Sequence, residues 1–218
     1  NSAKLLLMSA SSPLPEIAAI VPSAVPPELS VKELQSNWET YEKLCGKAVK
    51  DGMSDLLAAL GERLVMCPAS PREDQYGAYP GGMIEHSLKV CATMRNLNKS
   101  LGFDLPVGSV LKVGLLHDIG KLGDLSNEYF VEQDSSWHRE KLGQFYKFNE
   151  NLNKMSVSHR TLWLLQHFGI ELNNDEWLAI QLAQGSHFEE NRFYVGHEPT
   201  LALLLQQSKA LTIHTSKG

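Results

Sequence analysis

The chain has few cysteines, no long apolar run and no excess of positive charge. Its three cysteines, Cys45, Cys67 and Cys91, follow no Cys-x-x-Cys spacing, so neither a disulfide framework nor a zinc ribbon is expected. No stretch approaches the roughly 20 apolar residues of a membrane span. The net charge of −5 predicts no general polyanion-binding surface. These absences predict a cytoplasmic protein with reduced thiols and no membrane partner, and they disfavour nucleic acid as a partner without excluding it.

The composition predicts one domain with a proline-rich leader. Hydrophobic residues make up 43% of the 218 residues, which is enough for one core. Residues 1–29 are rich in serine, proline and alanine and are expected to be extended, and residues 30–218 are expected to form a single helical domain. Ser30 and Glu33 have the spacing of a capping box, which begins the first long helix. Further helices are expected at residues 83–100, 106–119, 138–149, 158–168, 174–185 and 199–213. No strand-period run is found.

The most informative motif is the dipeptide His117-Asp118, which ends an apolar helix that Pro106 begins. Two unpaired polar side chains are costly to bury at such a position. A divalent metal removes this cost, because imidazole nitrogen and carboxylate oxygen are both metal ligands. The motif therefore favours a metal site, with a hydrogen-bonded core histidine or a capping pair as the alternative.

A second motif precedes it in the segment Pro80-Gly81-Gly82-Met83-Ile84-Glu85-His86. A helix follows the glycines, and His86 shares one face of it with Val90 and Met94, so its side chain is expected to point inward. Such a histidine on its own is more often a hydrogen-bonded core residue. Together with His117-Asp118 on another inward-facing helix, it becomes a candidate ligand.

These two motifs resemble those of the HD-domain superfamily of metal-dependent phosphohydrolases. The segment Cys67-Pro68-Ala69-Ser70 with Tyr79-Pro80-Gly81-Gly82 is similar to small HD hydrolases of phages and bacteria, and to the HD domains of some bacterial 3′-to-5′ exoribonucleases. The resemblance covers residues 35–213. It implies an all-α fold, an HD-domain helical bundle with a metal site in its interior.

The resemblance also implies a ligand set. In that family a histidine, the His-Asp pair and a later aspartate hold one divalent ion, and two extra histidines serve binuclear members. His86, His117 and Asp118 match directly, and His187 and His159 are the candidates for the extra histidines, with His138 competing for the role. Either one or two ions are expected, and Mn, Fe, Co, Ni, Mg and Zn all stay open.

The sequence departs from this pattern at the last ligand. The matching stretch is Leu204-Leu205-Gln206-Gln207-Ser208-Lys209, which places Lys209 where the family has its aspartate, and no aspartate follows Asp175. Three readings stay open: a glutamate substitutes, histidines and water complete the shell, or the site has decayed. Lys209 itself either binds a substrate phosphate as a point charge or is solvated. The candidate substitutes are Glu189, Glu190 and Glu198.

The expected function is hydrolysis of a nucleotide phosphate ester, with a nucleoside monophosphate or a deoxynucleotide as the substrate. Asp118 would ligate and orient the attacking water, and Lys121 would neutralise developing charge. The alternatives are a 3′-to-5′ exonuclease, a di-iron oxygenase, and a non-catalytic module that binds a nucleotide or a partner protein. The oligomeric state is left open. The candidate substrate-binding residues are Arg72, His138, Arg139, Lys141 and Lys209.

Overall fold

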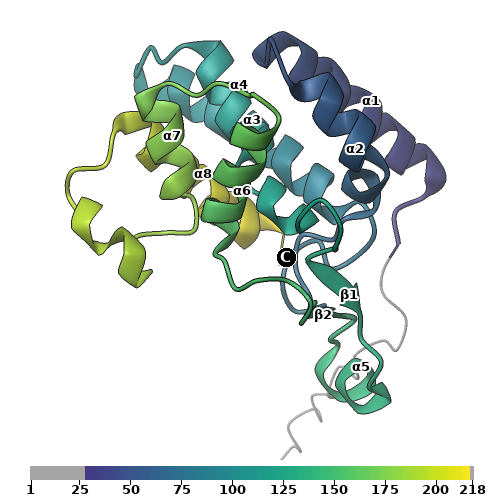
Figure 1. Cartoon of the computed structure of the whole chain (residues 1–218). Coiled ribbons are helices and arrows are strands. Elements are labelled where there is room, and N and C mark those ends of the chain that lie inside the picture. The colour runs from purple at the N-terminus through teal and green to yellow at the C-terminus, as the bar shows by residue number, and fades with distance from the viewer. Residues whose placement is uncertain (1–27, 217–218) are drawn as a thin grey trace, which may run out of the picture.

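The computed structural model describes residues 28–216, and these residues form a helical bundle with a small appended sheet (Figure 1). The expected leader lies outside the described residues, apart from residues 28 and 29. The elements are α1 (Val31–Ala48), α2 (Met53–Met66), α3 (Gly82–Leu101), α4 (Val107–Leu116), the 3₁₀ helix η1 (Ile119–Leu122), β1 (Phe130–Glu132), α5 (Ser136–Leu142), β2 (Tyr146–Phe148), α6 (Val157–His167), α7 (Asn174–Gln181), the 3₁₀ helix η2 (Glu189–Tyr194) and α8 (Thr200–Thr215). The predicted all-α class is confirmed.

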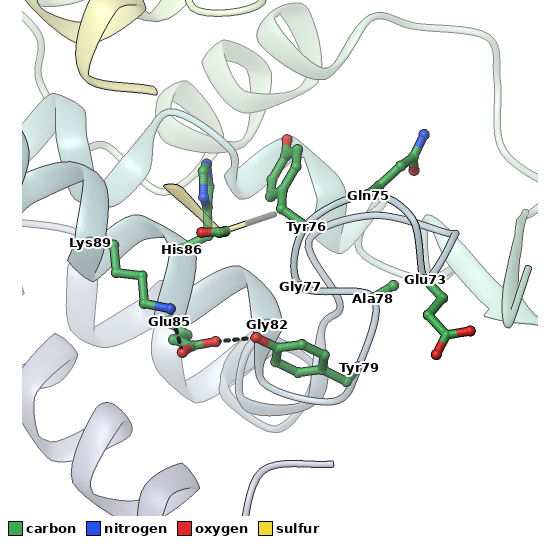
Figure 2. A pocket seen from close by; sticks show the side chains of 11 residues that line it. Glu73, Gln75, Tyr76, Gly77, Ala78, Tyr79, Gly82, Glu85, His86 and Lys89 are labelled. Carbon is green, nitrogen blue, oxygen red and sulfur yellow. Dashed lines mark hydrogen bonds and ion pairs between the residues drawn. The ribbon is translucent and has the colours of Figure 1, made fainter. Parts of the chain in front are cut away.

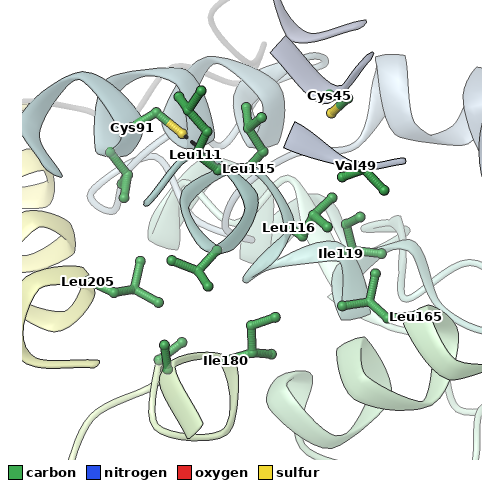
Figure 3. Packing of buried hydrophobic residues seen from close by; sticks show 14 of the residues in the cluster. Cys45, Val49, Cys91, Leu111, Leu115, Leu116, Ile119, Leu165, Ile180 and Leu205 are labelled. Carbon is green, nitrogen blue, oxygen red and sulfur yellow. Dashed lines mark hydrogen bonds between the residues drawn. The ribbon is translucent and has the colours of Figure 1, made fainter. Parts of the chain in front are cut away.

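The helix α4 lies at the centre of the bundle and contacts α1, α3, α7 and α8. Its residues are apolar on nearly every side, and every residue from Leu111 to Leu116 is buried apart from Lys112. Figure 3 shows Leu115 and Leu116 of α4 among apolar side chains from the surrounding helices. Because a helix that is apolar all round must be surrounded by protein, the residues that directly follow α4 also enter the interior.

Glycines allow the helices around α4 to approach closely. A Cβ atom on Gly114 would lie 2.5 Å from Cys91 Sγ of α3, and one on Gly120 would lie 2.2 Å from the carbonyl oxygen of Val157. Both distances are shorter than any real contact, so only glycine fits. α3 therefore packs directly on α4, and η1 packs directly on α6.

Most predicted helices are present, and the capping box is confirmed, because Ser30 and Glu33 each accept a hydrogen bond from the other's backbone. The prediction of a helix at 138–149 is wrong beyond residue 142. Gly143 has a left-handed φ of 56° and ends α5, and Phe148 then pairs with Phe130 in an antiparallel β1–β2 hairpin. The two strands have three residues each, which is too short for a strand-period run in the sequence. In Figure 1 the hairpin and α5 project from one end of the bundle.

The structure also bears on the expected reduced thiols and on the expected lack of a membrane span. The cysteines Cys45, Cys67 and Cys91 are buried and carry free thiols. Among the described helices, none has both the length and the apolar composition needed to cross a membrane.

Candidate metal centre

Two neighbouring helices bring His86, His117 and Asp118 together in the interior. His86 is the fifth residue of α3 and lies on the buried face with Val90 and Met94, as predicted. His117 and Asp118 follow α4 directly, at the junction with η1. All three are buried, and each offers a ligand atom within 4.8 Å of the other two. The helix was expected to continue to residue 119, but α4 ends at Leu116.

The ring of His117 is oriented by the backbone of its own helix. Its Nδ1 lies 2.9 Å from the carbonyl oxygen of Gly114, which can only accept, so Nδ1 carries the proton and Nε2 carries a lone pair. Metal-bound histidines are commonly held in this way. Burial lowers the pKa of His117 to about 4, so the ring is neutral at pH 7. Nε2 lies 3.6 Å from Asp118 Oδ1.

The ring nitrogens that face the centre have no hydrogen-bond partner. His86 Nε2 and His117 Nε2 are both buried, and neither bonds to another described residue. Burial also holds the pKa of His86 well below its usual value, so this ring is neutral as well. A buried polar atom without a hydrogen-bond partner costs about 1–3 kcal/mol. Two such ring nitrogens beside a carboxylate are therefore an arrangement that a bound cation would stabilise.

The carboxylate of Asp118 is already paired with two ammonium groups. Its Oδ2 lies 2.6 Å from Lys121 Nζ, and its Oδ1 lies 3.1 Å from Lys209 Nζ. Gln184 Nε2 donates to the same Oδ1 at 3.0 Å. Burial alone would raise the pKa of Asp118, but the charges of Lys121 and Lys209 hold it well below its usual value. With neutral imidazoles, one carboxylate and two ammonium groups leave one net positive charge.

Lys121 is anchored on the side away from Asp118. Its ammonium group donates to the carbonyl oxygen of Ala69 at 2.7 Å and to the hydroxyl of Tyr76 at 3.3 Å. Burial would lower the pKa of Lys121, but the neighbouring Asp118 carboxylate raises it above its usual value, so the group stays charged. Tyr76 belongs to the loop before α3, which packs closely on the start of this helix, since a Cβ atom on Gly82 would lie 2.1 Å from the oxygen of Gly77.

The centre can be reached from a cleft on the surface. The cleft has a volume of about 190 Å³, and His86 lines it together with Tyr76, Glu85 and Lys89. Figure 2 shows the rings of His86 and Tyr76 side by side, with Glu85 bonded to Tyr79 and Lys89. A second cleft of about 500 Å³ lies between α2 and the hairpin, and Lys121 is one of the residues that line it.

The two histidines of the cluster are free to bind one divalent ion. Neutral imidazole nitrogens and a carboxylate oxygen are suitable ligands for divalent metals, and the Nε2 atoms of both imidazoles lack another partner in the described chain. On the carboxylate side an ion would compete with Lys209 and Lys121. His86, His117 and Asp118 can therefore hold a single ion, in competition with ammonium groups.

The other predicted ligands lie outside this cluster. The side chain of His159 is 48% exposed and lies 3.8 Å from Glu190, while His187 is exposed and its ring contacts Phe188. His138 bonds to Ser135 at the start of α5. The role of these histidines as ligands stays a prediction.

The candidate substitutes for the missing aspartate also lie elsewhere. Glu189 pairs with Arg192 at the surface, and Glu198 accepts hydrogen bonds from Ser186 and the backbone of Gly196. Lys209, which the sequence resemblance places at the position of the missing aspartate, bonds to Asp118 Oδ1 at 3.1 Å.

Of the predicted substrate-binding residues, only Lys209 is buried, beside Asp118. Arg72 is half-exposed and pairs with Asp74 at 2.5 Å, and Arg139 and Lys141 are exposed on α5. Two residues of the centre were missed, Tyr76 and Gln184. Tyr76 comes from a loop without periodicity, and Gln184 follows the last turn of α7, so the sequence offers no pattern that places either one beside Asp118.

The motifs and the geometry agree with a comparison with protein families. A model of the HD domain matches residues 83–205, which is more than half of the chain and includes His86, His117 and Asp118. The chain belongs to the HD domain family. No curated protein and no solved structure matches it. HD domains bind divalent metals and are generally metal-dependent phosphohydrolases, although some are non-catalytic. The match ends before Lys209, so it does not cover the family's last ligand position.

Proposed function

We propose that this HD domain is a metal-dependent phosphohydrolase that acts on a nucleotide phosphate ester, with a nucleoside monophosphate or a deoxynucleotide as substrate. The observation that carries the proposal is the pair of partnerless ring nitrogens, His86 Nε2 and His117 Nε2, beside the buried carboxylate of Asp118. No other cluster of three metal-ligating side chains is found in residues 28–216.

The three residues would hold one ion, and a bound divalent ion would supply polarisation of a phosphoryl oxygen and activation of water. The chain itself provides the remaining requirements. Gly114 fixes the tautomer of His117, and Asp118 stays ionised because Lys121 and Lys209 flank it. The three N–H donors of Lys121 already bond to Asp118, Ala69 and Tyr76, so Lys121 would act on a phosphate only through its positive charge.

The cleft between α2 and the hairpin supports a nucleotide as the substrate. Lys121 lines it, and so do Tyr129, Phe130 and Tyr146. Aromatic rings stack on nucleobases, while a lysine binds phosphate as a point charge. A volume of about 500 Å³ lies in the range of small-molecule sites. A nucleotide whose base stacks on the hairpin would have its phosphate on the Lys121 side of this cleft, which none of His86, His117 and Asp118 lines.

The same cleft argues against a nucleic-acid strand. Its lining includes the exposed side chains of Glu62, Glu128 and Glu132, and Arg63 is occupied by three backbone carbonyls, at 2.6 to 3.3 Å. A polyanion needs a basic track along its backbone. A single nucleotide, with one phosphate group on the Lys121 side, avoids most of this repulsion.

A second candidate function is a non-catalytic module that binds a nucleotide or a partner. One observation favours it: both oxygens of Asp118 already bond to ammonium groups. The carboxylate of Asp118 thus has its counter-ions without a metal, and the centre keeps one net positive charge.

The proposal is tested by measuring metal content and hydrolysis together. Purified protein is reconstituted with manganese, cobalt, nickel, iron, magnesium or zinc, and each form is assayed with mono-, di- and triphosphate nucleotides and with deoxynucleotides. One bound ion per chain and release of phosphate from a monophosphate are expected, and His117→Ala is expected to lose both. A chain that takes up none of these ions and hydrolyses none of these nucleotides would contradict the proposal and favour the non-catalytic module.

A further inference from the structure

The ammonium group of Lys209 has a complete binding site inside the protein. Its Nζ donates to Asp118 Oδ1 at 3.1 Å, to Gln184 Oε1 at 3.3 Å and to the carbonyl oxygen of Ala183 at 3.4 Å. An ammonium group has three N–H donors, so each donor has an acceptor. The side chain is 8% exposed. Lys209 is thus a buried cation with a defined position, unlike a lysine on a solvated surface.

This cation occupies the oxygen that a metal ion in the centre would use. Asp118 Oδ1 is the carboxylate oxygen that lies 3.6 Å from His117 Nε2, and Lys209 bonds to that oxygen. The other oxygen is held by Lys121, at 2.6 Å. A divalent ion next to both partnerless imidazoles would therefore meet a positive charge within a few ångströms, in an interior that screens charges poorly.

We propose that Lys209 is a tethered cation that competes with divalent metal for Asp118 and thereby sets the metal affinity of this centre; the proposal rests on the metal-dependent function above. Without metal, Lys209 neutralises Asp118. A metal ion binds only when the ammonium group leaves Oδ1, although Gln184 and Ala183 still offer it acceptors. The centre then holds only one ion, and holds it weakly, because Lys209 is positively charged where a further carboxylate would have bound the metal.

The test compares the affinity for Mn²⁺ of the full chain and of Lys209→Met, which keeps the length of the side chain and removes its charge. The matched control is Lys112→Met, because Lys112 also pairs with a buried carboxylate, Glu176, at 2.9 Å and belongs to no part of the centre. Free Mn²⁺ is followed by electron paramagnetic resonance during titration, and the Mn²⁺-induced rise in Tm is measured alongside. Lys209→Gln serves as a second neutral variant if the methionine variant does not fold.

Removal of the charge is expected to tighten Mn²⁺ binding by about tenfold or more, with a larger Mn²⁺-induced rise in Tm, and Lys112→Met is expected to leave the affinity unchanged. Equal affinity in the native chain and the neutral variants would overturn the competition, even if the native chain hydrolyses nucleotides. Binding in the variants alone, with no metal and no activity in the native chain, would support the competition and contradict the proposed hydrolase. No binding in any form would overturn both.

Discussion

The ring of Tyr76 lies against the ring of His86, with the two centroids 4.4 Å apart, and its hydroxyl bonds to the ammonium group of Lys121 at 3.3 Å. One loop residue therefore contacts both a candidate metal ligand and the cation beside Asp118. In Figure 2 its ring stands next to His86 at the edge of the cleft. The loop before α3 is thus part of the centre and not only a connection to it.

The two functions of Tyr76 can be separated by substitution. Tyr76→Phe keeps the ring on His86 but removes one partner of a buried ammonium group, and a hydrogen bond to a charged group contributes about 1.5–3 kcal/mol. Tyr76→Ala removes the ring contact as well. Urea unfolding is expected to show a loss of stability in both variants, larger in Tyr76→Ala. Equal stability of the native chain and Tyr76→Phe would show that the hydroxyl contributes nothing to holding Lys121.

Asp118 and His117 are expected to respond differently to replacement, although they are adjacent. Asp118→Ala leaves Lys121 and Lys209 buried without their counter-ion, and breaking a buried ion pair costs about 3–5 kcal/mol. His117→Ala removes a neutral ring with one hydrogen bond and a partnerless nitrogen. Chemical denaturation is expected to show the larger loss for Asp118→Ala, with bound metal lost in both. The reverse order of stability would show that the two ion pairs are not formed in solution.

The close packing of α3 on α4 can be tested with two glycines of the same helix. A Cβ atom on Gly114 would lie 2.5 Å from Cys91 Sγ, whereas nothing lies within 4 Å of one on Gly108. Gly114→Ala is expected to destabilise the fold by about 1–3 kcal/mol. Gly108→Ala is expected to be neutral or to stabilise it by up to about 1 kcal/mol. Thermal unfolding of the two variants measures the difference, and similar Tm values would contradict the packing described for α4.

Helical periodicity predicted the part of the centre that lies on regular helices. His86 could be placed on a buried face because Val90 and Met94 follow it at helical spacing, and both are buried with it. His117 and Asp118 could be placed in the interior because the helix before them is apolar. In each case the neighbouring residues in the sequence are enough to predict that the side chain points into the interior.

The rest of the centre depends on contacts between distant segments. Lys121 bonds to Ala69 and Tyr76 across more than 40 residues, and Gln184 bonds to Asp118 across 66 residues. No local pattern specifies such contacts. The hairpin was missed for a related reason, since Phe130 and Phe148 become a strand pair only when Gly143 ends the intervening helix.

The substrate has two candidate contact regions, which mutation can distinguish. Tyr146 lines the cleft that Lys121 also lines, whereas Arg139 and Lys141 are exposed on α5. If the base stacks in the cleft, Tyr146→Ala is expected to weaken nucleotide binding by about 1–3 kcal/mol. If α5 contacts the phosphate instead, the double replacement Arg139→Ala/Lys141→Ala is expected to raise KM or lower kcat/KM, by an amount that corresponds to about 1.5–3 kcal/mol per lost charged hydrogen bond. Steady-state kinetics on the best nucleotide compare the two variants. Unchanged kinetics in a variant would show that the region it alters does not contact the substrate.

Burial of neutral histidines predicts a pH dependence of stability in the metal-free protein. The pKa of His117 is about 4 in the folded chain, against an ordinary value of 6.5. Between these values the unfolded chain binds a proton that the folded chain does not, so stability decreases as the pH falls from 6.5 to 4. His86 acts in the same direction, because burial also lowers its pKa. The pKa of Asp118 is held below its ordinary 3.8, so its own contribution is lost only at still lower pH.

The shift of His117 alone corresponds to about 3 kcal/mol of stability over this range. Urea unfolding in the presence of a chelator at pH 7, 5.5 and 4.5 is expected to show this decrease. His117→Asn is expected to reduce the slope, because asparagine does not titrate. His214→Ala is the control, since His214 is exposed at the end of α8, and its slope is expected to match that of the native chain. A native slope that persists in His117→Asn would mean that His117 has the same pKa in the folded and unfolded chains, and would contradict the burial of a neutral ring at the metal centre.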